Sequence, residues 1–381
     1  MAAFVNGSMA HPMDYDDTID EPVHHPTANT LAPALAMAER VGGVSGKDFI
    51  TAIALGNDMG IRLSGAPTTT NYVAVYPWFP LTLFGIFDAV TAAGKILKLS
   101  EEQMINALGI ALHRAVGISS AIADPASDLR AIRDGFTGKS GVIAVLMAEK
   151  GISTCKDAIE KLFKVFYDGE YDPKALTIDL GKNFRGTGVS LKPWPACRET
   201  HGYIQACQQI TKEHGIKPDQ IEEVIITVGQ FAAEHTCEPL EARRNPTKSI
   251  GAKFSLPFVV AIALTKGEVK IADFLPENLK DPKVLEMAKR INYKVDTTFK
   301  TLLPTQTEIK TKDGKAFTVR LETTRGNPED PLSREGMIAK FKDCANYIKN
   351  PIPAAKLEEL IAKLLELEKV KDMKEITDFL S

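Results

Sequence analysis

Apolar residues recur every three or four positions through most of the first half of the chain, which is the spacing of a helix with one buried face. Thr30 is a cap signal for the first of these helices, which has Pro33 in its first turn, and Ser100 followed by two acids is another helix start. Such helices bury their apolar stripes against one another, so a helical domain is expected. The pattern predicts helices over residues 29–43, 45–65, 83–99, 100–117 and 137–151.

The pattern changes near residue 190. Residues 222–230 have the β-branched content of a strand, and residues 307–323 alternate around Asp313-Gly314, which is a strong hairpin signal. Residues 251–267 form an apolar helical segment in which Pro257 predicts a kink or a late start. Amphipathic helix returns after residue 332, and its apolar faces are expected to rejoin the first helices.

The predicted fold class is therefore mainly α, with a large all-helical domain and a smaller α+β domain inserted before the C-terminal helices. The expected boundaries are 1–188 for the first part of the helical domain, 189–331 for the α+β domain and 332–381 for the returning helices. The Gly- and Pro-containing segment 326–333 is the linker candidate.

Composition excludes several classes of function. The 381 residues carry a formal net charge of -3, so no global positive field points to nucleic acid or to an anionic membrane surface. No apolar run reaches the roughly 18 residues of a membrane span, and the start has no secretory signal pattern. The five cysteines are scattered without a Cys-x-x-Cys pair, which predicts a reduced cytoplasmic protein without a disulfide framework.

The stretch 13–27, MDYDDTIDEPVHHPT, gathers five acids and two histidines. A metal site, a solvated polar loop and a proton-handling site for an anionic substrate all fit these residue types. The calcium pattern Asp-x-Asp-x-Asp-Gly and the zinc pattern His-Glu-x-x-His are both missing, so no metal is expected. Asp14 and Thr18 stand four apart and share a face if the segment is helical, and most of the other acids are expected to form a polar rim.

Two other segments contain candidate binding residues. Residues 135–141, GFTGKSG, approach the phosphate-loop pattern, but Arg133 occupies the first glycine position and no strand precedes it, so nucleotide binding is excluded. Lys139, placed at an expected helix start, is then a surface lysine, a ligand for a carboxylate or a catalytic acid. In residues 192–201, KPWPACRETH, Lys192 and Arg198 are candidates to clamp carboxylates, and Cys197 is either a weak acid or a buried small residue.

Several blocks occur in the order seen in one family. They are AAFVNGSMAHPMDYDDT, HPTANTLAPALAMAERVGG, LSEEQMINALGIA, KPWPACRETHGYIQA and AKFSLPFVVAIAL. The chain resembles the MmgE/PrpD family over nearly its whole length. That family includes 2-methylcitrate dehydratase, cis-aconitate decarboxylase and an iminodisuccinate epimerase. The resemblance implies a large helical domain with a smaller lid domain, a homodimer, and catalysis without a metal or another cofactor.

The resemblance also implies site residues. In the decarboxylase pattern an aspartate, a threonine four residues later and a histidine in a His-Pro block look like Asp14, Thr18 and His25, with one extra residue before the histidine. The family lysine in a later Gly-rich helix start looks like Lys139, and the lysine that opens the lid block looks like Lys192.

Three departures from the family pattern bear on the reaction. Pro80 stands where a site histidine is expected, and a proline cannot transfer a proton. Cys197 stands where the decarboxylase has a histidine, although other family members have cysteine there. The family usually has further helices before AAFVNG, so a partner that supplies them is a further expectation.

The resulting hypothesis is a cofactor-independent lyase, a hydro-lyase most like 2-methylcitrate dehydratase, with a small di- or tricarboxylate bound between the helical domain and the lid. His25 would transfer the proton next to a carboxylate, because histidine is the side chain whose pKa is set near neutrality. The alternatives are an epimerase, isomerase or decarboxylase of a related acid, and a non-catalytic or split-subunit paralogue. Asp14 and Thr18 would set the surroundings of His25, and the carboxylates would be held by Lys139, Lys192 and Arg198.

Overall fold

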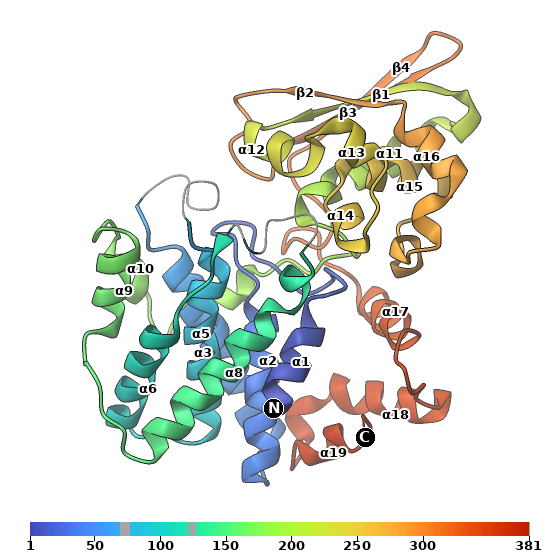
Figure 1. Ribbon diagram of the computed structural model, residues 1–381. Coiled ribbons are helices and arrows are strands. Elements are labelled where there is room, and N and C mark those ends of the chain that lie inside the picture. The colour runs from blue at the N-terminus through green and yellow to red at the C-terminus, as the bar shows by residue number, and fades with distance from the viewer. Residues whose placement is uncertain (69–76, 120, 122–126, 381) are drawn as a thin grey trace. The chain divides into compact units, whose positions relative to one another are not determined.

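The computed structural model of the protein describes residues 1–68, 77–119, 121 and 127–380. Their contacts divide the chain into two units, which are described separately (Figure 1). The first unit comprises Met1–Pro12, Asp16–Val189 and Phe341–Ser381, and the second comprises Met13–Tyr15 and Ser190–Lys340.

The first unit is built from helices, as predicted from the apolar periodicity. Ser100 caps one of them: its hydroxyl accepts from the Gln103 amide, and the Gln103 side chain accepts from the Ser100 amide, a capping box. The helices are α1 (Ala2–Ala10), α2 (Pro26–Val41), α3 (Gly46–Ser64), α5 (Pro80–Ile96), α6 (Glu101–Arg114), α8 (Leu129–Glu149), α9 (Ala158–Phe166), α10 (Pro173–Thr177), α18 (Ala354–Leu365) and α19 (Lys374–Thr377). Helix α17 (Arg334–Ala345) contains the boundary between the units.

Helix α2 begins earlier than the sequence pattern indicated. Its first residue is Pro26, with His25 at the N-cap, so Thr30 lies inside the helix and Pro33 lies two turns into it. A proline suits the first helical position because its missing N–H would have no partner there and its φ is already helical. His25 is thereby fixed at the start of a buried helix.

Helix α8 also begins earlier than predicted, at Leu129 instead of near residue 137. The glycines that suggested a loop are packing positions. A Cβ on Gly135 would lie 2.1 Å from the Ser8 hydroxyl of α1, and one on Gly141 would lie 2.5 Å from the Ala89 Cβ of α5. Glycine at these positions therefore lets α8 approach both neighbouring helices closely.

The core of the first unit lies between these helices and includes Phe84, Phe87 and Phe163. Residues from the C-terminal segment, among them Leu360 and Met373, belong to the same core. The end of the chain thus completes the helical unit that its first half begins.

The second unit contains a four-stranded sheet with strand order β2-β1-β3-β4. Strand β1 (Ile221–Val228) pairs in parallel with β2 (Ile291–Val295) and antiparallel with β3 (Thr305–Thr311). Strand β3 pairs antiparallel with β4 (Ala316–Leu321). The turn between β3 and β4 contains Asp313 and Gly314, which confirms the predicted hairpin.

Helices pack with this sheet around a second core. The late start predicted from Pro257 is confirmed, because α15 begins at Leu256 after the Ser255 cap. The helices of the unit are α11 (His201–His214), α12 (Gln230–Ala232), α13 (Leu240–Arg244), α14 (Ser249–Lys253), α15 (Leu256–Lys266) and α16 (Pro282–Ala288). The mainly helical fold class with a small α+β portion is thus confirmed, whereas a lid role for that portion stays a prediction.

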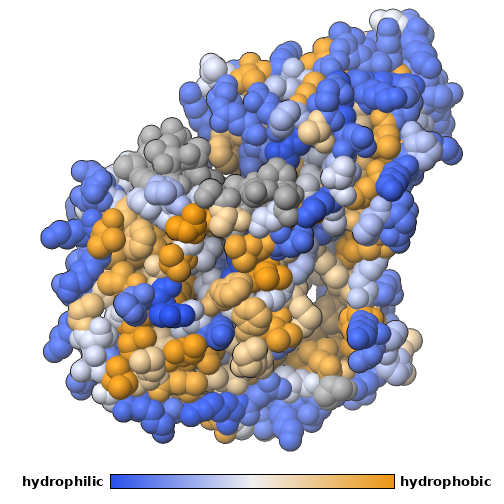
Figure 2. All heavy atoms as spheres, in the orientation of Figure 1, coloured by the Kyte–Doolittle hydropathy of each residue, from blue (hydrophilic) through white to orange (hydrophobic). Residues whose placement is uncertain are grey.

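No helix in the described ranges combines the length and the apolar character needed to cross a membrane. Apolar side chains nevertheless gather on an outer face of the first unit (Figure 2). Exposed apolar patches are typical of faces that another protein covers, and the expected homodimer stays a prediction. The exposed apolar residues of α1 and α8 include Val5, Met9, Ile132, Phe136, Ile143 and Met147.

A buried polar network lies inside the first unit. His24 Nε2 is 2.6 Å from Asp88 Oδ2 of α5, and His24 Nδ1 is 3.1 Å from the Ser64 hydroxyl of α3. His24 and Asp88 are both fully buried. The network therefore fixes the residue that directly precedes His25.

Gly60 of α3 provides the space for this network, which gives a test. A Cβ on Gly60 would lie 2.0 Å from Asp88 Oδ1, so we expect Gly60→Ala to lower the free energy of unfolding by about 1–3 kcal/mol through overpacking. Gly251→Ala is the control, because Gly251 is also helical and a Cβ there meets nothing within 4 Å. Denaturant unfolding of both variants checks this. Equal stability of the two would show that the Asp88 carboxylate is not held in place.

Candidate functional site

Residues 11–25 connect α1 to α2 as a loop and not as a helix. Asp14 has a φ of 51°, in the left-handed region, and belongs to the second unit, whereas Thr18 belongs to the first. The Thr18 hydroxyl donates to the carbonyl of His24 at 3.1 Å. The helical condition for Asp14 and Thr18 to share a face is therefore not met, and the Thr18 hydroxyl already has a partner.

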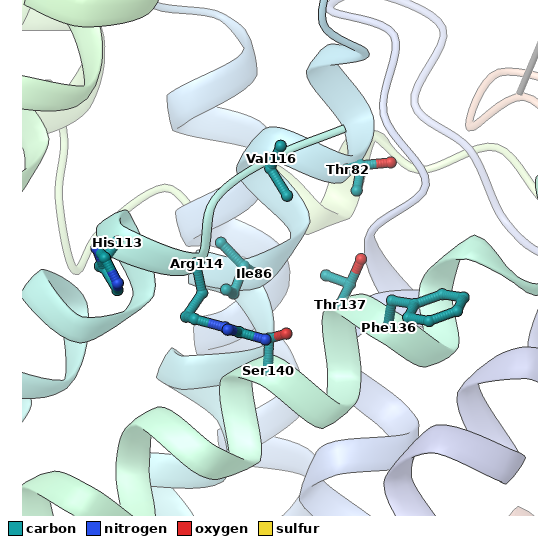
Figure 3. A pocket seen from close by; sticks show the side chains of 8 residues that line it. All are labelled: Thr82, Ile86, His113, Arg114, Val116, Phe136, Thr137 and Ser140. Atoms are coloured by element: carbon teal, nitrogen blue, oxygen red, sulfur yellow. The ribbon is translucent and has the colours of Figure 1, made fainter. Parts of the chain in front are cut away.

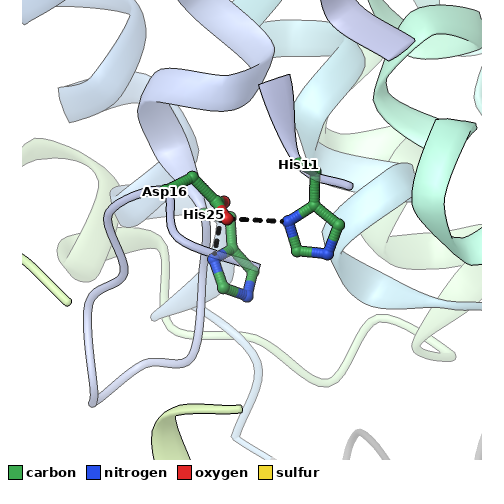
Figure 4. Close-up of side chains that lie close together, drawn as sticks. All are labelled: His11, Asp16 and His25. Atoms are coloured by element: carbon green, nitrogen blue, oxygen red, sulfur yellow. Dashed lines mark hydrogen bonds and ion pairs between the residues drawn. The ribbon is translucent and has the colours of Figure 1, made fainter. Parts of the chain in front are cut away.

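Three side chains of the loop and its flanks form a cluster (Figure 4). His11 Nδ1 lies 2.9 Å from Asp16 Oδ1, and His25 Nδ1 lies 3.1 Å from Asp16 Oδ2. The two imidazole rings are 5.1 Å apart. His25, the proton carrier predicted from sequence, is thus joined through one carboxylate to His11, which the sequence had not suggested.

His11 is almost completely buried, at 1% exposure, and its Nε2 has no hydrogen-bond partner within the described residues. Burial, and then the positive charge of Arg133, lower the pKa of His11 below its ordinary value of 6.5, although Asp16 opposes them. His11 is therefore neutral at physiological pH. Since Nδ1 faces a carboxylate, which accepts hydrogen bonds only, the proton lies on Nδ1 and Nε2 has a free lone pair.

Arg133 of α8 lies in the same region and is 3% exposed. Its guanidinium carbon is 5.0 Å from the centre of the Phe79 ring, and its Nε is 3.4 Å from Asp134 Oδ1. Neither Nη1 nor Nη2 has a hydrogen-bond partner in the described ranges. A buried cation whose donors are unused is costly unless an anion supplies the acceptors.

Pro80, which replaces the histidine expected from the family, is the first residue of α5 and follows Phe79. The Phe79 ring also lies 5.9 Å from the guanidinium carbon of Arg130, one turn before Arg133. This segment therefore places the Phe79 ring beside Arg130 and Arg133, where the family pattern would have an imidazole.

Asp17 has a structural role that the polar-rim interpretation missed. Its carboxylate accepts from the Thr27 hydroxyl at 2.5 Å and from the Thr27 amide at 3.3 Å, at the start of α2. Its carbonyl lies 2.9 Å from His25 Nδ1. Burial raises the pKa of Asp17, although the Thr27 hydrogen bonds oppose this shift. The assignment of Asp16 and Asp17 to a polar rim is therefore wrong, because both support the imidazole cluster.

Lys139 lies inside α8 and not at its start, which removes the helix N-terminus argument for it. It is exposed, and its Nζ is 5.9 Å from the Phe4 ring centre. Lys139 comes six residues after Arg133, so its side chain is rotated roughly 240° around the helix axis from that of Arg133 and lies about 9 Å further along the axis. No hydrogen bond or ion pair joins Lys139 to His25 in the part of the chain that the structure describes. Its catalytic role stays a prediction.

In the second unit, Lys192 is fully buried and its Nζ contacts a carboxylate oxygen of Asp14, and also the Asp14 carbonyl at 3.3 Å. Tyr15 donates its hydroxyl hydrogen to the Pro193 carbonyl at 2.9 Å. The structure thus brings together Asp14 and Lys192, which were predicted separately and lie 178 residues apart.

Arg198 is buried, and its guanidinium donates to the side chain of Asn327 and to the carbonyl of Arg325 at 3.2 Å. Its Nη1 is also 3.4 Å from His201 Nδ1. These bonds fix the loop at 325–327, so a carboxylate clamp by Arg198 would have to share donors that are already in use.

Cys197 belongs to another cluster of the second unit. Its Sγ lies 3.8 Å from Glu199 Oε2, which is 2.7 Å from His235 Nδ1. Burial, and then the negative charges of Glu199 and Asp14, raise the pKa of Cys197 well above its ordinary value. Cys197 is therefore a thiol at neutral pH, as both sequence interpretations of it allow.

Two clusters contain residue types that bind divalent metals: His11, Asp16 and His25, and Cys197, Glu199 and His235. Positive charge lies close to both, from Arg133 in the first and from Lys192 in the second. A neighbouring cation disfavours a bound dication, and the unused donors of Arg133 favour an anion. The first cluster is thus suited to hold a carboxylate beside a neutral base.

A surface pocket of about 250 Å³ lies elsewhere on the first unit, between α5, α8 and the end of α6. Figure 3 shows the Arg114 side chain extending toward Ser140. The pocket is separate from the imidazole cluster, because its lining residues are Thr82, Ile86, His113, Arg114, Val116, Phe136, Thr137 and Ser140.

Comparison with known proteins agrees with the resemblance in the sequence. The MmgE/PrpD N-terminal domain matches residues 1–174, and the MmgE/PrpD C-terminal domain matches residues 194–366. A cis-aconitate decarboxylase of Homo sapiens is 27% identical over 395 residues, which cover 100% of this chain and 79% of that protein. One of Aspergillus terreus is 23% identical over 406 residues, covering 100% of this chain and 81% of that protein. The resemblance is confirmed, and the chain belongs to the MmgE/PrpD family.

Proposed function

We propose that the protein is a lyase that acts on a small di- or tricarboxylate by moving a proton at a carbon next to a carboxylate. The observation that supports this most directly is the buried Arg133 guanidinium, whose Nη1 and Nη2 have no hydrogen-bond partner in the described chain. A carboxylate matches two such donors in a bidentate arrangement. The neutral His11 in the same region would supply a base for the adjacent carbon.

Within this class, we propose dehydration, as in 2-methylcitrate dehydratase, as the first reaction to test. Elimination of water needs a base for the C–H bond and an acid for the leaving hydroxyl, and the His11–Asp16–His25 cluster contains two imidazoles. Decarboxylation of cis-aconitate is the second candidate, because the similar human and Aspergillus proteins are cis-aconitate decarboxylases. Pro80 and Cys197, at two positions of decarboxylase histidines, weigh toward dehydration.

The remaining roles are part of the proposal. Lys192 and Arg198 would bind carboxylates, with Cys197 beside them as a weak acid, and Asp14 would orient the Lys192 ammonium group. Lys139 would contribute only if its exposed side chain turned away from Phe4. Neither a metal nor an organic cofactor is required by this chemistry, because the base and the cations are all side chains.

The test is to incubate the purified protein with 2-methylcitrate, citrate, cis-aconitate and iminodisuccinate. Ultraviolet absorbance would follow the double bond, and CO2 release and optical rotation would follow the alternatives. We expect a double bond to form from 2-methylcitrate, with the same rate in the presence of a chelator. Loss of activity with chelator and its return with a divalent ion would contradict the metal-free mechanism. If no acid is turned over or bound, the substrate class is wrong and a non-catalytic paralogue is favoured.

A further inference from the structure

We propose that His11 removes the proton next to the substrate carboxylate and that His25 protonates the leaving group, as a base–acid pair across Asp16. This assignment rests on the proposed function and adds a catalytic residue that the sequence pattern did not provide. It also moves His25, which the sequence suggested as the group that transfers the proton next to a carboxylate, to the leaving group.

The acceptors beside each Nδ1 decide which nitrogen atoms can react. His11 Nδ1 is hydrogen-bonded to Asp16. His25 Nδ1 is hydrogen-bonded to the Asp17 carbonyl, with Asp16 close by. Both Nδ1 atoms face the same carboxylate, at 2.9 Å from His11 and 3.1 Å from His25. An ionised carboxylate offers acceptors only, so each Nδ1 carries a hydrogen. Both Nε2 atoms are consequently the ones left for proton transfer, and the shared carboxylate stabilises either ring when it becomes charged.

The two rings differ in their surroundings. The charged and titratable groups around His11 come from three elements. Asp16 lies in the loop, His25 lies at the start of α2, and Arg133 and Asp134 lie in α8. His11 Nε2 is buried without a partner within the described residues, so nothing in this part of the chain competes for the lone pair. His25 is more exposed, at 8%, and its Nδ1 also contacts the Asp17 carbonyl at 2.9 Å. His25 can therefore exchange its Nε2 proton with water more readily than His11.

Arg133 favours His11 over His25 as the base of the pair. A carboxylate bound by the Arg133 guanidinium would make the neighbouring C–H bond more acidic, because the cation stabilises negative charge that develops on the carboxylate. The same cation disfavours a protonated His11, which keeps His11 in its basic form before the reaction.

The proposed step balances without a further reactant. The C–H bond breaks first: its proton goes to His11 Nε2, and the electron pair stays on the carbon and on the carboxylate that Arg133 would bind. That electron pair then forms the C=C bond. The C–O bond on the adjacent carbon breaks, and the leaving oxygen takes the proton of His25 Nε2 and departs as water. His11 then releases its proton and His25 regains one, so the pair returns to its starting state.

The experiment separates the two histidines by isotope exchange. Wild type, His11→Gln, His25→Gln and His113→Gln are incubated with 2-methylcitrate in D2O, and deuterium uptake next to the carboxylate is measured together with product formation. We expect His11→Gln to lose both by about a hundredfold or more, the usual contribution of a general base. His25→Gln should keep exchange and lose product formation. His113→Gln should equal wild type, because His113 is exposed and lies outside the cluster.

The native protein supplies a second measurement in case a variant does not fold. The exchange rate of wild type should fall as pH decreases, with a midpoint below 6.5, because a depressed pKa means that His11 takes up its proton only under more acidic conditions. A midpoint above 6.5 would overturn the assignment, as would exchange that survives in His11→Gln but is lost in His25→Gln. Turnover that is normal in His11→Gln would overturn the pair and leave the proposed function standing. Absence of turnover by wild type with every acid of the panel would instead overturn the proposed function.

Discussion

Arg133→Met is expected to lower kcat/KM for the substrate by about a hundredfold or more, while the midpoint of thermal unfolding stays the same or rises. The loss follows from two charge-assisted hydrogen bonds to a carboxylate, worth roughly 1.5–3 kcal/mol each. The unchanged or higher stability follows because, in the described chain, Nη1 and Nη2 of the buried guanidinium have no hydrogen-bond partner to lose. The ion pair of Arg133 with Asp134, at 3.4 Å, is not a hydrogen bond, so we expect the gain from removing a buried charge to offset the loss of this pair.

Arg62→Met is the matched control, because Arg62 is a buried arginine whose donors are used. It donates to Asp58 at 2.7 Å, to the Ile178 carbonyl at 2.8 Å and to the Asn183 carbonyl at 3.0 Å. Its replacement should reduce the free energy of unfolding by about 3–5 kcal/mol, since it leaves Asp58 buried without this partner. Steady-state kinetics measures kcat/KM, and calorimetry measures the stability, of both variants. An Arg133→Met protein that is as unstable as Arg62→Met, or fully active, would contradict a ligand role for Arg133.

His24→Leu is expected to lower the free energy of unfolding at neutral pH by about 3–5 kcal/mol, because it leaves the buried Asp88 carboxyl without its hydrogen-bond partner. Activity should fall as well, since His24 directly precedes His25. Denaturant unfolding and steady-state kinetics measure the two effects. The double variant His24→Leu/Asp88→Leu should recover much of the stability, because it removes the buried carboxyl together with its partner.

The same variant should respond to pH in a defined direction. Burial raises the pKa of Asp88, although the charge of His24 opposes the shift, so the carboxyl takes up a proton at a higher pH in the folded protein than in the unfolded chain. The cost of His24→Leu should therefore be largest at neutral pH and shrink as the pH falls through this raised pKa. An effect that is independent of pH and fully additive with Asp88→Leu would show that the two residues do not act as a pair.

Local signals in the sequence predicted much of the fold. Ser100 and Pro257 marked helix starts because capping and the missing proline N–H act within a single turn. Asp313-Gly314 marked the hairpin because a tight turn also depends only on residues that are adjacent in the sequence. The start of α8 was wrong because glycine has two uses: Gly135 looked like a loop residue, and it is a point of close contact with α1.

The candidate site was predicted less completely, because its members meet only in the folded chain. His25 was found from its His-Pro block, but its partner through Asp16, His11, belongs to the other side of a loop whose conformation no spacing rule predicts. Arg133 was noticed only as a misfit in a phosphate-loop pattern. Had α8 been extended back to Leu129, Arg133 would have stood as a charged residue within a helix, which indicates a buried site more strongly than the exposed Lys139 does.

The short segment Met13–Tyr15 belongs to the second unit although both of its neighbours along the chain belong to the first. The second unit is consequently not a continuous module that can be exchanged at two junctions. A chimera that took residues 190–340 from one family member and the rest from another would join a foreign Asp14 to Lys192 and a foreign Tyr15 to Pro193. A transfer of the second unit between family members should therefore also include residues 13–15. Otherwise the buried Lys192 ammonium group of one protein would have to pair with the Asp14 carboxylate of another.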